Sequence, residues 1–182
     1  MILMIVGESA CGKSTVEKVL RRDYDYNKIT SYTTRPPREG EVNGVDYHFV
    51  SEEEFERLQI EDKFIEVGEY NNWKYGSATE DYVGNIAIVL TPHGMRTLRN
   101  KLKEEYKVIY IDVPRKNRLI ASLNRSTGTF QEIEEIKRRD ASDVGQYDGI
   151  KDEADIIIEN PGFKKSPEEI AWEIIRQIYL KD

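Results

Sequence analysis

The N-terminal region contains residues whose types and spacing suit the binding of phosphate. Residues 7–14 read GESACGKS and match the pattern G-x-x-x-x-G-K-S/T, directly after an apolar segment and before a helix-like one. The glycines let the backbone curl so that successive N–H groups point at phosphate oxygens, and the following helix adds partial positive charge. We expect Lys13 to bridge the β- and γ-phosphates of ATP and the Ser14 hydroxyl to ligate Mg²⁺. The residues expected to contact ATP in this loop are Gly7, Ser9, Ala10, Cys11, Gly12, Lys13, Ser14 and Thr15.

A second group of candidate residues begins with a pair of arginines. Arg35 and Arg38 lie three residues apart in the segment SYTTRPPR, which two prolines stiffen. Two guanidinium groups at this spacing can grip a phosphate bidentately, which lysine does less well. The sequence therefore predicts a second, phosphate-bearing substrate beside the phosphate-binding loop.

The elements that must position these residues alternate between strands and helices. The expected strands are short, rich in Ile and Val and apolar throughout, which is typical of parallel strands covered on both faces. They are Ile2–Val6, Ile86–Leu90, Val108–Ile111 and Ile156–Ile158, and the helix-like stretches between them are 13–22, 92–104 and 114–124. With 182 residues, of which 38% are hydrophobic, the chain can bury one core. We expect a three-layer α/β sandwich around a parallel sheet.

The C-terminal helix has the clearest boundary signal. Ser166 and Glu169 form a capping box, and Pro167 occupies the first helical position. The apolar residues that follow at helical spacing are Ile170, Ala171, Ile174, Ile175, Ile178 and Tyr179. We expect this stripe to pack on the sheet.

Two stretches interrupt the alternation. Residues 31–82 are rich in Tyr, Glu, Gly and Asn, with strand-like pieces at Tyr47–Val50 and Phe64–Glu69 around a helix-like Ser51–Leu58. Residues 125–139 are polar and basic. We expect both to lie over one edge of the sheet in a single domain whose core is formed by residues 1–30, 83–124 and 140–182.

The blocks that follow the phosphate-binding loop resemble those of guanylate kinases, a family of P-loop nucleoside monophosphate kinases. The matching blocks are S-x-T-T-R-x-P-R, G-E-V-N-G-x-D-Y-x-F-V-S and Y-G-S, and the resemblance runs from the loop to Ser77, whereas the C-terminal half is similar mainly in layout. The resemblance implies that 31–82 is a nucleoside-monophosphate-binding insertion and 125–139 a short lid. It also implies Mg²⁺-dependent phosphorylation of GMP or dGMP by ATP.

The same resemblance implies roles for the acceptor-side residues. Arg35, Arg38, Tyr47 and Tyr75 would hold the acceptor phosphate, whereas Ser31 and Glu66 would read the guanine, with Ser77 beside them. The chemistry agrees, because the guanine N1–H and N2–H₂ donors lie side by side and one carboxylate accepts from both, while a hydroxyl donates to O6. Sites built on such hydrogen bonds discriminate by about 10⁴ or more.

One block departs from the family pattern. Guanylate kinases usually carry aspartates in an I-L-D-I-D-x-Q-G type block, where this chain has Val89 and Thr91. Thr91 can accept a hydrogen bond from the guanine amine but brings no charge. The departure leaves open an altered acceptor, such as dGMP or a broader set of nucleotides, and Asp112 is a candidate to assist the magnesium.

Arginines dominate the segment that resembles the lid. We expect Arg125, Arg138 and Arg139 to close over the transferring phosphoryl group, with Arg118 nearby. The alternative is an exposed helix in which these arginines only pair with neighbouring glutamates. Asn160 falls where the family contacts adenine.

The remaining observations narrow the class of protein. A net charge of −7 argues against a general nucleic-acid binder, and no apolar stretch is long enough to span a membrane. The single cysteine, Cys11, is typical of a reducing compartment, so we expect a cytoplasmic protein, and its side chain is expected to fill space in the loop. The expected partners are nucleotides. Monomer and homodimer both stay open. Two rival functions remain: a kinase of another nucleoside monophosphate, and a non-catalytic module of the same fold that binds phosphopeptides.

Overall fold

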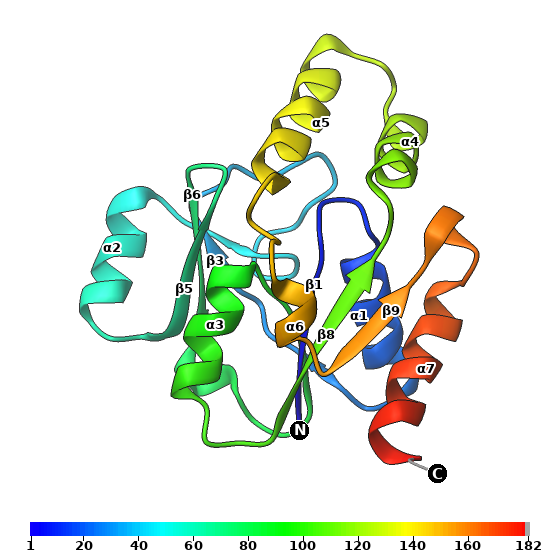
Figure 1. Ribbon diagram of the computed structural model, residues 1–182. Coiled ribbons are helices and arrows are strands. Elements are labelled where there is room, and N and C mark those ends of the chain that lie inside the picture. Colours follow the sequence, from blue (N-terminus) through cyan, green and yellow to red (C-terminus); the bar gives the residue numbers. More distant parts are fainter. Residues whose placement is uncertain (181–182) are drawn as a thin grey trace.

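The centre of the protein is a parallel sheet of five strands. The computed structural model describes residues 1–180, and Figure 1 shows the sheet between two layers of helices. The strands, in spatial order, are β2 (Asn27–Lys28), β7 (Ile86–Val89), β1 (Ile2–Val6), β8 (Tyr106–Asp112) and β9 (Ile156–Glu159). In β1, Ile2 lies opposite Ile86 on one side and Tyr106 on the other. The predicted three-layer α/β sandwich is confirmed.

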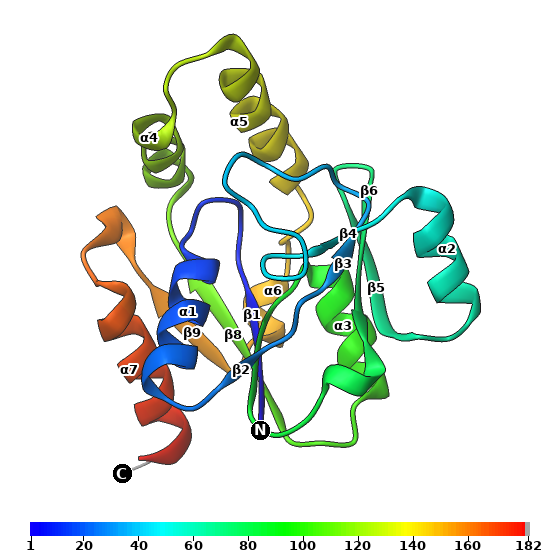
Figure 2. The same cartoon turned by 180° about the vertical axis from the view of Figure 1, so that it is seen from behind.

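Alternate residues of β1 supply two separate cores, one on each face of the sheet. Leu3 and Ile5 pack toward α1 (Lys13–Asp23) and α7 (Pro167–Tyr179). Ile2 and Met4 pack toward α3 (Pro92–Lys101) and the short α6 (Ile150–Glu153). Figure 2 shows α1 and α7 together on one face. Because both faces are covered at the centre of the sheet, β1 and β7 are apolar at every position, as predicted.

The insertion forms its own small sheet beside the core. Its strands, in spatial order, are β4 (His48–Phe49), β3 (Tyr32–Thr33), β6 (Trp73–Ala78) and β5 (Phe64–Tyr70), and its helices are α2 (Glu52–Ile60) and the 3-10 turn η1 (Thr79–Asp81). The Ser51 side chain caps α2 by accepting from the Glu54 N–H. The expected strands and helix are therefore present, with bounds shifted by one or two residues.

Residues 125–139, the predicted lid, span the end of α4 (Arg115–Arg125) and most of α5 (Phe130–Asp143), which lie at the top of Figure 1. A capping box of Thr129 and Glu132 starts α5. The helix then continues past residue 139, where we expected the lid to end, and delivers Asp143 to the core. The last four residues of α5 therefore bring Asp143 to the phosphate-binding loop.

The C-terminal elements agree with the sequence except at their ends. The capping box of Ser166 and Glu169 is present before α7, which follows the 3-10 turn η2 (Pro161–Phe163). Ile170, Ala171 and Ile174 are buried as predicted, but Tyr179 is 54% exposed. The last turn of α7 extends beyond the main core, where the Tyr179 hydroxyl hydrogen-bonds to Tyr26.

Two of the other predicted helices differ at their ends. The stretch expected at 92–104 stops at Lys101, because Leu102 adopts an extended conformation before β8. The stretch expected at 114–124 starts one residue later, after Pro114. Among residues 1–180, no helix has the length and apolarity needed to cross a bilayer.

Candidate active site

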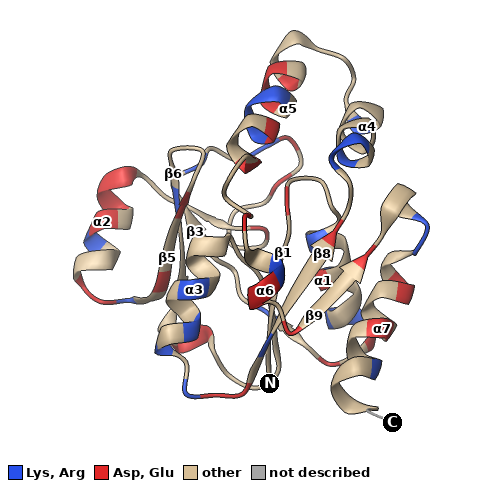
Figure 3. Cartoon of the chain, viewed as in Figure 1, with Lys and Arg blue, Asp and Glu red and all other residues tan. Residues whose placement is uncertain are grey.

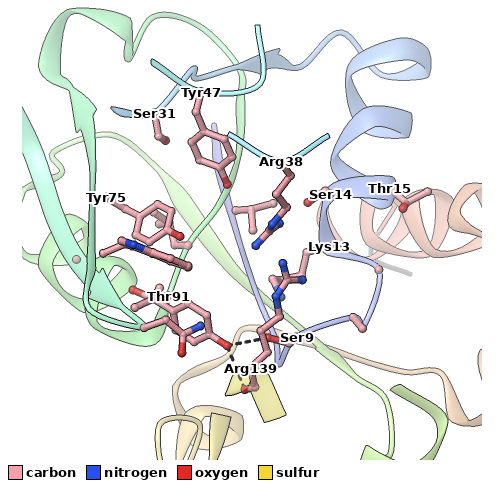
Figure 4. A pocket seen from close by; sticks show the side chains of 18 of the residues that line it. Ser9, Lys13, Ser14, Thr15, Ser31, Arg38, Tyr47, Tyr75, Thr91 and Arg139 are labelled. Carbon is pink, nitrogen blue, oxygen red and sulfur yellow. Dashed lines mark hydrogen bonds between the residues drawn. The ribbon is translucent and has the colours of Figure 1, made fainter. Parts of the chain in front are cut away.

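One cavity of about 300 Å³ lies between the phosphate-binding loop, the insertion and the lid. The predicted site residues that line it are Ser9, Ala10, Gly12, Lys13, Ser14, Thr15, Ser31, Arg38, Tyr47, Glu66, Tyr75, Thr91, Arg125 and Arg139. Figure 4 shows Ser31 and Tyr47 at one end and Ser9 and Arg139 at the other, with Arg38 and Lys13 between them. The fold thus brings together residues that lie far apart in the sequence.

The phosphate-binding loop owes its shape to close backbone packing. A Cβ atom on Gly7 would lie 2.7 Å from the Ile111 carbonyl oxygen and from the Cys11 sulfur, so only glycine fits. Gly12 has a φ of 99° and precedes the first turn of α1. The Lys13 ammonium donates to the carbonyls of Gly7 and Glu8, at 2.6 and 2.9 Å. Burial raises the pKa of the Cys11 thiol, which agrees with a filling role and not with a reactive thiolate.

The two predicted phosphate-gripping arginines have different surroundings. Arg38 lines the cavity, and the aromatic rings of Tyr47 and Tyr75 lie 6.0 Å apart between their centroids. Arg35 is 2% exposed, pairs with Glu41 at 2.9 Å and lies 5.3 Å from the centroid of Tyr47. Arg35 and Arg38 are therefore not equivalent here, because Arg35 pairs with Glu41 and packs on Tyr47, and a joint grip on phosphate stays a prediction.

Positive charge is concentrated around Arg38. Burial, together with the nearby Arg139 and Arg35, lowers the pKa of Arg38. A phosphate dianion placed here would relieve the repulsion among these guanidinium groups. A cluster of guanidinium groups of this kind suits a site for a doubly charged anion.

Glu66 is the buried carboxylate of the acceptor side. It is 2% exposed, and burial raises its pKa to about 7, opposed by a hydrogen bond from the Ser77 hydroxyl at 2.8 Å. The Tyr82 hydroxyl lies 2.8 Å from the same Ser77 oxygen. A Cβ atom on Gly94 would lie 2.9 Å from Glu66 Oε2, so glycine makes room for this carboxylate. Ser77 contacts Glu66 but does not itself line the cavity.

Thr91, in place of an expected acid, has a structural partner. Its hydroxyl accepts from the Gly94 N–H at 3.1 Å and caps α3. One lone pair of the hydroxyl is thus used by the helix. Val89 also lines the cavity and adds no polar group.

The lid arginines divide between the cavity and the surface of α5. Arg125 and Arg139 line the cavity, whereas Arg138 lies over Trp73 at 4.3 Å and donates to the Asn71 carbonyl at 3.4 Å. Arg138 and Arg139 both pair with Glu135 at 2.7 Å. Figure 3 shows acidic and basic residues mixed along α5. Arg139 thus lines the cavity and still pairs with a glutamate, and the closing of these arginines over a phosphoryl group stays a prediction.

Comparison with known proteins agrees with this geometry. Residues 1–177 match the family model for guanylate kinase. Guanylate kinases of Campylobacter jejuni (strain RM1221) and Rubrobacter xylanophilus are each 32% identical to this chain, over 98% and 97% of it and over 87% and 94% of their own lengths. The chain belongs to the guanylate kinase family. A crystal structure of guanylate kinase from Anaplasma phagocytophilum superposes with a TM-score of 0.69 at 25% identity, covering 99% of this chain and 85% of that one.

Asn160 lies apart from the cavity of this guanylate kinase family member. It is 2% exposed, its amide donates to the Lys165 carbonyl at 3.1 Å, and its side-chain oxygen accepts from the Lys165 N–H at 2.9 Å. Both ends of the amide are used to hold the turn before α7. The structure therefore gives Asn160 a local structural role, and its contact with adenine stays a prediction.

The oxygen-bearing side chains near the phosphate-binding loop differ in whether another group already occupies them. Ser14 is exposed at the start of α1 and lines the cavity. Asp112 pairs with Lys151, and Glu8 accepts from the Tyr110 hydroxyl at 2.9 Å. Residues 1–180 contain no group of three or more His, Cys, Asp or Glu residues placed to hold a metal ion. Ser14 fits Mg²⁺ all the same, because this ion usually keeps waters and substrate phosphates and takes few protein ligands.

Sequence reasoning missed several residues at the cavity. Tyr70 and Trp73 flank a tight turn at Asn71 and Asn72, both of which have positive φ, and Tyr147 lines the same cavity. Asp143, at the end of α5, reaches the phosphate-binding loop. The Asn-Asn pair between two aromatic residues is a hairpin signal that could have located Tyr70 and Trp73. Nothing in the local sequence marks Asp143.

Proposed function

We propose that this chain transfers the γ-phosphoryl group of ATP, bound with Mg²⁺, to the phosphate of GMP or dGMP. The observation that carries the proposal is a single cavity with two different ends. The phosphate-binding loop with Ser9 lies at one end and Ser31 with Tyr47 at the other, and Lys13 and Arg38 lie between them. Tyr75 and Glu66 line the same cavity. Two nucleotides seated in this way would meet at their phosphates.

Catalysis in this proposal is positioning together with charge neutralisation. The acceptor phosphate is the nucleophile and is already anionic near neutral pH, so no general base and no covalent intermediate are needed. Lys13, Arg38, Arg125 and Arg139 supply positive charge around the reacting phosphates, with Arg138 held beside them on α5. Bound Mg²⁺ would neutralise phosphate charge, with Ser14 as its protein ligand.

Base selection is assigned to the buried end of the cavity. Glu66 in its ionised form accepts from the guanine N1–H and N2–H₂, whereas adenine would present a lone pair at N1. The Ser31 hydroxyl lines the same cavity and would donate to O6. Ser77, fixed to Glu66 at 2.8 Å, holds the carboxylate in place.

A second candidate is a kinase of other or broader base specificity. It is favoured by the absence of an acid at Val89 and Thr91 and by the use of the Thr91 hydroxyl as a helix cap. Fewer charged contacts to the base would leave discrimination mainly to Glu66. The proposal needs no partner other than the two nucleotides, and the single buried cysteine supports a reducing, cytoplasmic setting.

A panel of acceptors tests the proposal. The protein is incubated with ATP, Mg²⁺ and each of GMP, dGMP, AMP, CMP, UMP and TMP, and the release of ADP is measured. We expect strong turnover with GMP or dGMP and at least about 100-fold less with AMP. Strong turnover of CMP or TMP without GMP or dGMP would establish the second candidate. A lack of ADP release with every acceptor would overturn both and favour a non-catalytic module.

A further inference from the structure

Three segments that are distant in the sequence meet at one buried carboxylate. Asp143, the last residue of α5, accepts from the Ser9 N–H at 2.8 Å and from the Tyr70 hydroxyl at 2.9 Å. The hydroxyls of Ser9 and Tyr70 lie 2.8 Å apart. Ser9 belongs to the phosphate-binding loop, Tyr70 to the insertion and Asp143 to the helix that leads out of the lid. The carboxylate therefore joins all three parts of the cavity.

This junction is buried and electrically balanced. The Asp143 side chain is 4% exposed and pairs with Arg118 at 3.1 Å. The same Arg118 guanidinium donates to the carbonyls of Ser9 and Val113, each at 3.1 Å. Burial raises the pKa of Tyr70 to about 12, so its hydroxyl keeps its proton near neutral pH. The N–H, the carbonyl and the hydroxyl of Ser9 all have partners, which limits the positions that this part of the loop can take.

Tyr70 is also connected to the acceptor end of the cavity through the hairpin that carries it. Strands β5 and β6 pair without interruption from Glu66 and Ser77 to Tyr70 and Trp73. Glu66 and Tyr75 on this hairpin are the groups assigned above to the acceptor base and phosphate. An acceptor that orders the hairpin would also order the Tyr70 hydroxyl, and with it Ser9.

We infer that Tyr70, through Ser9 and Asp143, couples acceptor binding to the shape of the phosphate-binding loop, so that each nucleotide strengthens the binding of the other. Tyr70 is in this sense a positioning residue that acts through Ser9. The inference rests on the proposed function, because it needs both nucleotides to bind. By thermodynamic linkage, the factor by which the acceptor tightens the donor must equal the factor by which the donor tightens the acceptor.

The test measures that factor in the full chain and in Tyr70→Phe. Calorimetry gives the dissociation constant of the β,γ-imido analogue of ATP with Mg²⁺, in the absence and in the presence of saturating GMP. We expect GMP to tighten the analogue about fivefold or more in the wild-type protein. In Tyr70→Phe, which keeps the ring and loses only the hydroxyl, we expect the factor to fall to about 1, with the two separate affinities changed by no more than about threefold.

Tyr26→Phe is the matched control. It removes a hydroxyl from a tyrosine pair, Tyr26 and Tyr179, on the far side of the core. It should leave the coupling factor at the wild-type value.

Two results would overturn the inference while leaving the proposed function intact. One is that both nucleotides bind the wild-type protein without affecting each other. The other is that Tyr70→Phe keeps the full coupling factor. If the wild-type protein binds neither GMP nor the ATP analogue, both the proposed function and this inference are wrong.

Discussion

The two ends of the cavity are built in different ways. The donor end is made mainly of backbone, whose shape follows from close packing, as where Gly7 lies against the Ile111 carbonyl. The acceptor end is made of side chains on a small separate sheet, and each has its own partner, such as Glu41 for Arg35 or Ser77 for Glu66. A site made of backbone offers few side chains to change, whereas a site made of side chains can be altered one residue at a time.

The largest expected effect comes from Lys13, the one basic side chain of the phosphate-binding loop. Lys13→Ala should lower kcat at least about 100-fold, because it removes positive charge from the phosphates in the transition state. The dissociation constant of GMP should change by less than about twofold, since the residues assigned to the guanine, Ser31 and Glu66, belong to the acceptor end and not to the phosphate-binding loop. Steady-state kinetics and calorimetry measure the two quantities. The control is Lys18→Ala, on the exposed face of α1, and a large loss of GMP affinity in Lys13→Ala would contradict the division of the cavity into two ends.

A smaller effect, confined to base choice, is expected at the acceptor end. Glu66→Gln replaces an acceptor by a group that also donates, so the preference for GMP over AMP should fall about 100-fold. The ratio of kcat/KM for the two acceptors is the measurement. Glu69→Gln, at an exposed position on the same strand, should leave the ratio unchanged. A ratio that is equal in Glu66→Gln and the wild-type protein would show that another group reads the base.

The smallest expected effect is a dependence of GMP binding on pH. Burial raises the pKa of Glu66 to about 7, and only the ionised form can accept from both guanine donors. KM for GMP should therefore rise as the pH falls below 7, by up to about tenfold per unit, and level off above pH 7. The phosphate of GMP also titrates in this range. Subtracting the profile of Glu66→Gln isolates the contribution of Glu66, and identical profiles for the two proteins would rule that contribution out.

Prediction from sequence succeeded where the signal is local. Ser166, Pro167 and Glu169 define the start of α7 within four consecutive residues, and the structure shows the expected capping box. The phosphate-binding loop is equally contiguous. Predictions of helix ends without such signals were less accurate, as at Leu102. The direction of the chain there depends on where β8 must begin.

Local sequence determined the phosphate-binding loop, the alternation of strands and helices, and the residue types available to hold a second nucleotide. Only the tertiary structure decided which contacts those residues make. Arg38 lines the cavity while Arg35 packs on Tyr47. Asp143 accepts hydrogen bonds from Ser9 and Tyr70. The physical reason is that a loop or a cap is formed by neighbours in the chain, whereas a buried hydrogen-bond partner is set by how distant elements pack.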